Sequence, residues 1–105
     1  MEHNKIYTIL VFTRLEEDKH GWPEFGSERI VGYYTDKDKA FNAVIGNACD
    51  INETCYDYAL IEEVEEGLYN AAFNRWIFKY NKDADKYEQI EELDFMKHFS
   101  GFTIG

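Results

Sequence analysis

The stretch Lys5–Leu15, KIYTILVFTRL, decides the fold, because β-branched and aromatic residues dominate it and predict a strand. Successive side chains of a strand point to opposite faces of its sheet. One face is predicted to carry Ile6, Leu10 and Phe12, and the other Tyr7, Ile9, Val11 and Leu15. Because both faces are apolar, we expect a central strand in a sheet that is covered on both sides.

Further elements are predicted outward from this stretch. Glycines, a proline and charged residues indicate a loop at residues 16–28. A helix is expected to begin at Thr35 and to end near Cys49, and an apolar C-terminal segment, either a short helix or an irregular tail, closes the chain. The other predicted strands are residues 29–35, 56–64, 75–80 and 86–91, the last two forming a hairpin through residues 81–85.

The expected helix has a start signal and one apolar stripe. Thr35 and Asp38 form a variant of the capping box, with Asp in place of Glu or Gln. Apolar residues recur at three- and four-residue steps, at Ala40, Phe41, Val44, Ile45 and Ala48. We therefore expect Phe41 and Ile45 to face the sheet.

These elements predict a single α+β domain over residues 1–105, in the order ββαβββ. The sheet is expected to be mostly antiparallel, with four or five strands and one main helix. One helix covers one face, so the second face needs either the C-terminal segment or another chain as its cover. If the C-terminal segment covers the second face incompletely, an apolar patch is left, and a patch of more than a few hundred Å² commonly marks an interface. We therefore predict a homodimer with two-fold symmetry.

The charge balance argues against two classes of partner. Eleven Lys and Arg against 21 Asp and Glu give a net charge of −10. Such a surface repels the phosphates of nucleic acids and the anionic face of a membrane. No stretch approaches the ~20 apolar residues of a membrane span, and the N-terminal residues do not form a signal peptide. We expect a cytoplasmic protein in which Cys49 and Cys55 are thiols.

Two stretches carry a resemblance to known sequences. VGYYTDKDKAFNAV, from Val31 to Val44, resembles a strand-to-helix segment of small uncharacterised proteins of bacteria and their phages. EEVEEGLYN, followed by WIFKYNKDADKYEQIEE, resembles a later hairpin of the same proteins. The resemblance covers roughly half of the chain. It implies the order ββαβββ, and it carries no functional residue with it.

The residues that commonly carry chemistry form no recognisable motif. The seven glycines show neither G-x-G spacing nor G-K-[ST], so they indicate no phosphate site. Cys49 and Cys55 form no tight ligand pair for zinc, and a cysteine at a helix end is typically a small buried hydrophobe. Either cysteine could act in catalysis with a histidine only if the two side chains lay close together, and nothing in the sequence brings them together. We predict no catalytic residue, no cofactor and no metal.

Residues 81–92 allow two interpretations. Asn81, Asp83, Asp85 and Glu92 stand at the first, third, fifth and twelfth positions of a calcium-binding loop. Lys86 occupies the sixth position, where the sharp turn of such a loop needs glycine. A polar hairpin turn between two strands explains the same residues, and we favour it and predict no calcium site.

Two groups of residues are candidates for an interaction surface. The loop 16–28 carries His20, Trp22 and Phe25, and exposed aromatic residues are the usual anchors of interfaces. The alternative is that Trp22 and Phe25 fold back and close the core. The second group is acidic, and it either blocks aggregation as solvated charge or mimics a phosphate backbone. Its members are Glu62, Glu63, Glu65, Glu66, Glu88, Glu91 and Glu92.

The sequence therefore favours a non-enzymatic protein–protein interaction module, a small acidic regulator or inhibitor of a nucleic-acid-handling complex. The alternative is a self-associating structural or accessory protein. An enzyme comes third, and a buried histidine or carboxylate with a shifted pKa beside a deep pocket would favour it.

Overall fold

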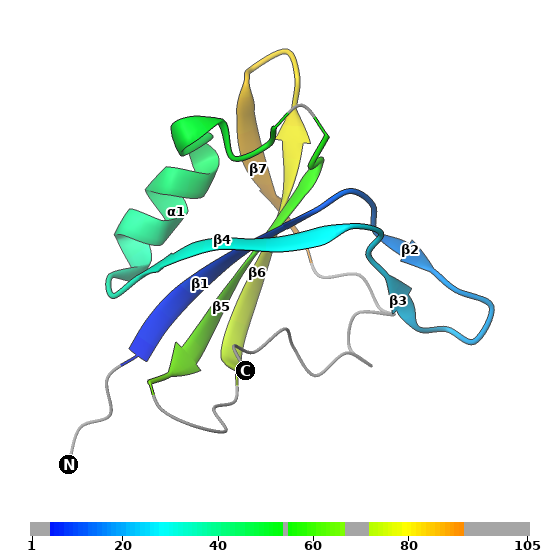
Figure 1. Cartoon of the computed structure of the whole chain (residues 1–105), viewed down its shortest axis with the longest axis horizontal. Coiled ribbons are helices and arrows are strands. Elements are labelled where there is room, and N and C mark those ends of the chain that lie inside the picture. The colour runs from blue at the N-terminus through cyan, green and yellow to red at the C-terminus, as the bar shows by residue number, and fades with distance from the viewer. Residues whose placement is uncertain (1–4, 54, 67–71, 92–105) are drawn as a thin grey trace.

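The computed structural model describes residues 5–53, 55–66 and 72–91. In this part of the chain a five-stranded antiparallel sheet, a two-stranded sheet and one α-helix confirm the predicted α+β class (Figure 1). The predicted C-terminal cover lies outside the described residues. The elements are β1 (Lys5–Phe12), β2 (Glu16–Glu17), β3 (Pro23–Glu24), β4 (Glu28–Tyr34), α1 (Lys37–Ile45), the 3-10 turn η1 (Ala48–Asp50), β5 (Tyr58–Glu65), β6 (Ala72–Asn81) and β7 (Lys86–Ile90).

The large sheet has the order β4-β1-β5-β6-β7, so β1, β5 and β6 lie inside it. β1 pairs with β5 without interruption, from Lys5 opposite Glu65 to Phe12 opposite Tyr58. The strands turn progressively from β4, which runs across Figure 1, to β6 and β7, which run nearly upright. This is the twist that is usual for sheets of L-amino acids.

The sheet has an apolar core on each face, as the sequence of β1 predicts. The first core lies under α1, and its buried residues are Ile9, Val11, Ala40, Val44, Ala59, Ile61, Phe78 and Tyr87. The second core lies on the opposite face, called here the second face, and consists of Leu10, Phe12, Leu15, Phe25, Leu60 and Ile77. The assignment of Leu15 to the face of Val11 is wrong, because β1 ends at Phe12 and the strict alternation ends with it.

The helix begins one residue later than predicted. Asp36 is the N-cap, and its carboxylate accepts hydrogen bonds from the backbone N–H of Asp38 (2.8 Å) and Lys39 (3.4 Å). Asp is among the strongest N-cap residues, so it takes the position predicted for Thr35. The helix stops at Ile45 rather than near Cys49, because Gly46 caps it and Asn47 adopts a left-handed φ of 50°.

The buried stripe of α1 is narrower than the sequence predicts. Ala40 and Val44 are buried, and Phe41 is half-buried with its ring edge-on to Trp76 and Phe78. Ile45 is exposed, so the prediction that it faces the sheet is wrong. Ala43 is the other residue of α1 that packs against the first core, so the contacting stripe covers residues 40–44 and ends before Ile45.

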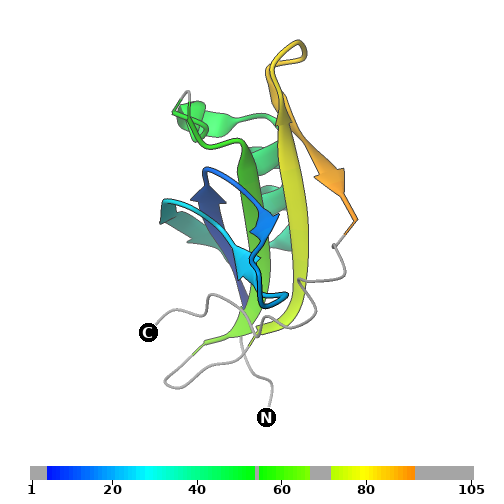
Figure 2. The same cartoon turned by 90° about the vertical axis from the view of Figure 1, so that its right-hand side faces the viewer.

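The hairpin interpretation of residues 75–91 is confirmed. β6 and β7 pair from Ile77 opposite Ile90 to Asn81 opposite Lys86, and Figure 2 shows their turn extending beyond the other strands. The side-chain oxygen of Asn81 accepts from the N–H of Asp83 at 3.0 Å and of Ala84 at 3.3 Å. That oxygen closes the turn between strands, whereas a calcium loop of the predicted spacing joins two helices. The absence of calcium binding stays a prediction, since Glu92 lies outside the described residues.

No helix in the described ranges is long and apolar enough to cross a membrane.

We predict that Phe41→Ala lowers the free energy of unfolding by about 2–3 kcal/mol. The loss is smaller than the roughly 3–5 kcal/mol of a fully buried phenylalanine, because Phe41 is only half-buried. Ile45→Ala is the matched control on the same helix, and its loss should stay below about 1 kcal/mol. Urea denaturation of both variants measures the difference. Equal losses would mean that α1 is rotated relative to the packing described above.

Candidate functional site: the hairpin of β2 and β3

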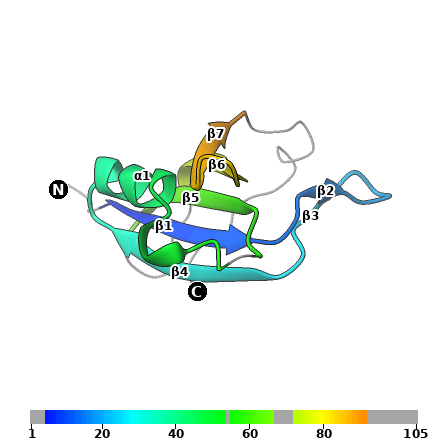
Figure 3. The same ribbon diagram turned by 90° about the horizontal axis from the view of Figure 1, so that it is seen from above.

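Residues 16–24, called here the β2–β3 hairpin, form a small projection from the sheet. Glu16 pairs with Glu24 and Glu17 with Pro23, and the hairpin links β1 to β4. Figures 1 and 3 show it extending away from the sheet, at the end of the molecule opposite α1. A segment that the sequence predicts as an irregular loop is therefore ordered by backbone pairing.

Aromatic packing and hydrogen bonds fix the base of the hairpin. The ring of Phe25 stands edge-on to Phe12, with the ring centroids 5.1 Å apart, and Phe25 is buried in the second core. The N–H of Arg14 donates to the carbonyl of Phe25 at 3.2 Å. Gly26 has a φ of +71°, and an added Cβ would lie 2.3 Å from the hydroxyl of Thr13, so only glycine fits there. The interpretation that Phe25 folds back and closes the core is confirmed.

Asp18 organises the tip of the hairpin. Its carboxylate accepts from the N–H of His20 at 2.8 Å and from the N–H of Trp22 at 2.9 Å. Its own N–H donates to the carbonyl of Trp22 at 2.8 Å, and Gly21 completes the turn with a φ of 82°. The hydrogen bond from the N–H of Trp22 has the largest effect on the pKa of the Asp18 carboxyl and lowers it, and desolvation opposes it. The N–H and the charge of His20 make smaller contributions that also lower this pKa.

The tip presents an aromatic side chain within an acidic surface. Trp22 is 53% exposed, so the proposal that it folds back with Phe25 is wrong for this residue. Glu16, Glu17 and Glu24 of the same hairpin are exposed, and Glu24 is paired with Arg14. His20 is exposed as well. The hairpin therefore carries one large exposed aromatic side chain and three exposed carboxylates, on a backbone that hydrogen bonds hold at its tip.

Two of the acidic candidates are buried, which corrects their assignment to a solvated surface. Glu62 is 1% exposed and Glu63 is 8% exposed. They lie on β5, which is a central strand and not an edge. Glu62 stands between Thr8 of β1 and Arg75 of β6 in the register of the sheet.

Glu63 has polar partners on both neighbouring strands. It accepts from the hydroxyl of Tyr7 at 3.0 Å and from the side-chain amide of Asn74 at 3.2 Å, and its carboxylate lies 3.6 Å from the ammonium of Lys5. Burial raises the pKa of Tyr7, and the neighbouring Glu63 raises it further. These partners come from the strands on either side of β5, and buried carboxylates persist where they are paired in this way.

The other acidic candidates do not form one surface. Glu65 is half-buried and Glu66 is exposed, and both lie at the end of β5. Glu88 and Glu91 are exposed, but Glu88 lies opposite Lys79, toward the other end of β6. Glu92 lies outside the described residues. The acidic array is therefore split between separate parts of the sheet.

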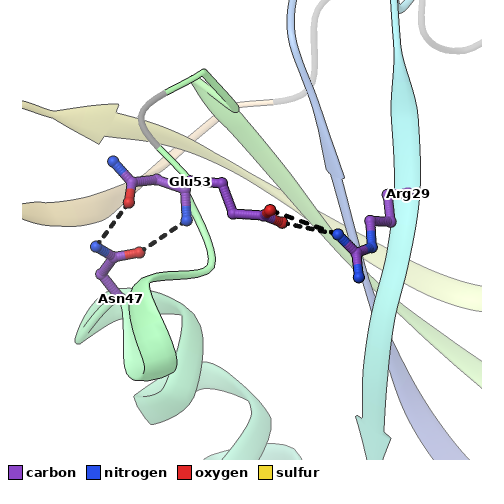
Figure 4. Close-up of polar contacts among 4 residues, drawn as sticks. Arg29, Asn47 and Glu53 are labelled. Atoms are coloured by element: carbon purple, nitrogen blue, oxygen red, sulfur yellow. Dashed lines mark hydrogen bonds and ion pairs between the residues drawn. The ribbon is translucent and has the colours of Figure 1, made fainter.

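The loop that follows α1 is a second polar cluster, and the sequence gives no sign of it. Figure 4 shows Asn47 bonded to residue 52 and Glu53 paired with Arg29 of β4. Four residues of this loop have left-handed φ angles: Asn47 (50°), Cys49 (54°), Asp50 (52°) and Glu53 (44°). The loop and β4 enclose an open depression of about 470 Å³, lined by Arg29, Ile30, Val31, Cys49, Asp50, Ile51 and Glu53.

Cys49 and Cys55 are both exposed free thiols, so the expectation of a buried cysteine at the helix end is wrong. The helix ends before Cys49, which removes that residue from the packed face of α1. In the described ranges, no group of three or more His, Cys, Asp and Glu side chains is arranged to hold a metal ion.

Comparisons with known protein families, with curated proteins and with solved structures find no match for this chain.

We predict that acid loosens the tip of the hairpin through Asp18. The pKa of Asp18 in the folded protein lies below the ordinary value of ~3.9 for an aspartate. The ionised carboxylate therefore stabilises the tip fully above pH ~3.9, and this stabilisation is lost as the pH falls through the lower pKa of the folded state. The backbone amide signal of Trp22, followed by NMR from neutral to acidic pH, should titrate with Asp18. Asp18→Asn keeps an oxygen acceptor but cannot titrate, and an unchanged profile in this variant would contradict the assignment.

Proposed function

We propose that the protein is a non-enzymatic interaction module that binds another protein through the β2–β3 hairpin. The observation that carries the proposal is Trp22, which is 53% exposed on a tip whose backbone is held by Asp18. Tryptophan dominates the binding energy of many interfaces. A side chain presented on a rigid backbone also loses less conformational entropy when it binds.

The chemistry of the hairpin favours a basic partner. Residues 16–24 contain Glu16, Glu17, Asp18 and Glu24 against Lys19 as the single Lys or Arg, and the whole chain has a net charge of −10. Complementary charge increases the rate of association and favours the correct partner. Proteins that handle nucleic acids carry basic surfaces, so a small acidic regulator or inhibitor of such a complex is the specific role that we propose.

Two other functions rank below this one. Self-association, which the sequence predicts, is favoured by the exposed hydrophobic side chains of β4. An enzyme would need a carboxylate such as Glu63 beside a substrate, but Tyr7, Asn74 and Lys5 already contact that group.

We place the protein in the cytoplasm, where the exposed thiols of Cys49 and Cys55 would stay reduced.

We predict that Trp22→Ala weakens binding of the native partner by at least about 30-fold, which is the loss expected for an anchor residue worth about 2 kcal/mol. A photoreactive residue introduced at position 20 identifies the partner in cells, and titration of the purified partner then gives the affinity. Ile45→Ala is the control, since it removes an exposed apolar side chain from α1. A partner that binds Trp22→Ala and the native chain equally would refute docking by the hairpin.

We also predict that the protein does not bind nucleic acids directly. Its net charge of −10 leaves few cations to displace counterions from phosphates. Fluorescence anisotropy with labelled single-stranded and duplex DNA and RNA should show no salt-sensitive complex at micromolar protein. Such a complex would reject both this prediction and the proposed preference for a basic protein partner.

A further inference from the structure

The two edge strands of the large sheet differ in what they expose. Five large hydrophobic side chains are exposed in the described ranges, and three of them, Ile30, Tyr33 and Tyr34, lie on β4. At the opposite edge, β7 exposes Lys86, Glu88 and Gln89 and buries Tyr87. Charged and polar side chains protect an edge strand against pairing with another chain. β7 carries such side chains along its length, whereas β4 carries charged side chains only at Glu28 and Arg29 and interrupts its pairing with β1 by a bulge at Val31.

A bulge in β4 determines which side chains share a face. Ile30 and Tyr33 stand opposite Leu10 and Thr8 of β1, so both project from the second face. On the other side of the strand, Arg29, Gly32 and Tyr34 stand opposite Val11, Ile9 and Tyr7, on the face of α1. Val31 is the extra residue of the bulge, and it packs against the first core.

We infer that β4 is an interface for a second copy of this chain, paired antiparallel to it about a two-fold axis between Val31 and Gly32. In this register Ile30 lies opposite Tyr33 of the second copy, Val31 opposite Gly32, and Arg29 opposite Tyr34. Each pair then shares a face, as directly opposed residues of antiparallel strands must. A shift of one residue would place Ile30 opposite Gly32 or Tyr34, which belong to the other face.

The side chains of this register suit a second copy better than another occupant. Both Ile30 side chains and both Tyr33 side chains meet on the second face and form one apolar cluster, since a two-fold axis makes each contact twice. Arg29, which pairs with Glu53 of its own chain, lies opposite Tyr34 of the second copy. β4 carries one acid, Glu28, and one base, Arg29, so the edge is locally neutral in a chain of net charge −10.

Sedimentation at micromolar concentration and physiological salt tests the interface. The native chain should sediment near twice the 12.4 kDa chain mass. Tyr33→Lys, which places a charge in the apolar cluster, should sediment near 12.4 kDa, and Gln89→Lys, which adds the same charge to β7, should remain dimeric. A monomeric native chain, or a dimer that survives Tyr33→Lys, would overturn the inference. Circular dichroism establishes that each variant is folded.

Cross-linking tests the register. In a background of Cys49→Ser and Cys55→Ser, Ile30→Cys and Tyr33→Cys are prepared as separate chains, mixed and mildly oxidised. The mixture should form a disulfide-linked dimer, because positions 30 and 33 are directly opposed. Either chain alone should not, since its thiols are offset by three residues, about 10 Å, which is beyond the reach of a disulfide. Equal cross-linking of all three samples, or none, would reject the register.

This interface is separate from the hairpin, so the two proposals fail separately. Trp22→Ala should remain dimeric, and Tyr33→Lys should keep its affinity for the native partner of the hairpin.

Discussion

The structure depends on the burial of β1 on both of its faces. Val11 and Phe12 are neighbours in the chain and both fully buried, yet their side chains enter different cores. Because successive residues of a strand point in opposite directions, this burial requires apolar cover above and below the sheet. Every described element outside the sheet can be understood from the face that it covers or from the connection that it makes.

A regular helix covers the first face of the sheet. The second face is covered in part by the chain segment that connects β1 to β4. α1 supplies Ala40 and Val44 to the first core. On the second face, Leu15 and Phe25 come from the two ends of the chain segment between β1 and β4. Both ends of the segment that contains the β2–β3 hairpin are therefore packed into the second core. This arrangement connects the core of the protein to its proposed function, since a rigid base makes the exposed Trp22 a better binding residue than a flexible loop would.

How far the sequence predicted the fold depends on which physical signal was available. The strand at Lys5–Phe12 and the hairpin at β6 and β7 were predictable, because alternation and turn chemistry act within a few residues. Leu15 was assigned to the wrong face because alternation cannot be followed beyond the end of a strand. Ile45 was assigned to the packed face of α1, but the position of a short helix over a twisted sheet is set by tertiary contacts.

The candidate site was predictable only in part, and for related reasons. The hairpin segment was recognisable from its aromatic residues, but Phe25 and Trp22 carry the same sequence signal and have opposite roles. Phe25 is the buried one of the two because its ring packs against Phe12, and this tertiary contact cannot be read from the sequence. Glu62 and Glu63 were assigned to a solvated surface because sequence does not show that β5 is a central strand. In the loop 47–53, Asn47 and Asp50 are residue types that favour a left-handed φ, whereas Cys49 and Glu53 rarely adopt it, so residue type does not predict the conformation of the whole loop.

Native-state hydrogen exchange tests the two-faced burial of β1 most directly. Amides inside the sheet that lie between two cores should exchange only through global unfolding, whereas those of a projecting hairpin open locally. The backbone amides of β1 and β5 should therefore give the highest free energy of opening in the chain, equal to the free energy of unfolding from denaturant titration. The amides of Asp18 and Trp22, although hydrogen-bonded, should open at a clearly lower free energy. If the amides of β1 opened as readily as those of the hairpin, β1 would not be the buried centre of the fold.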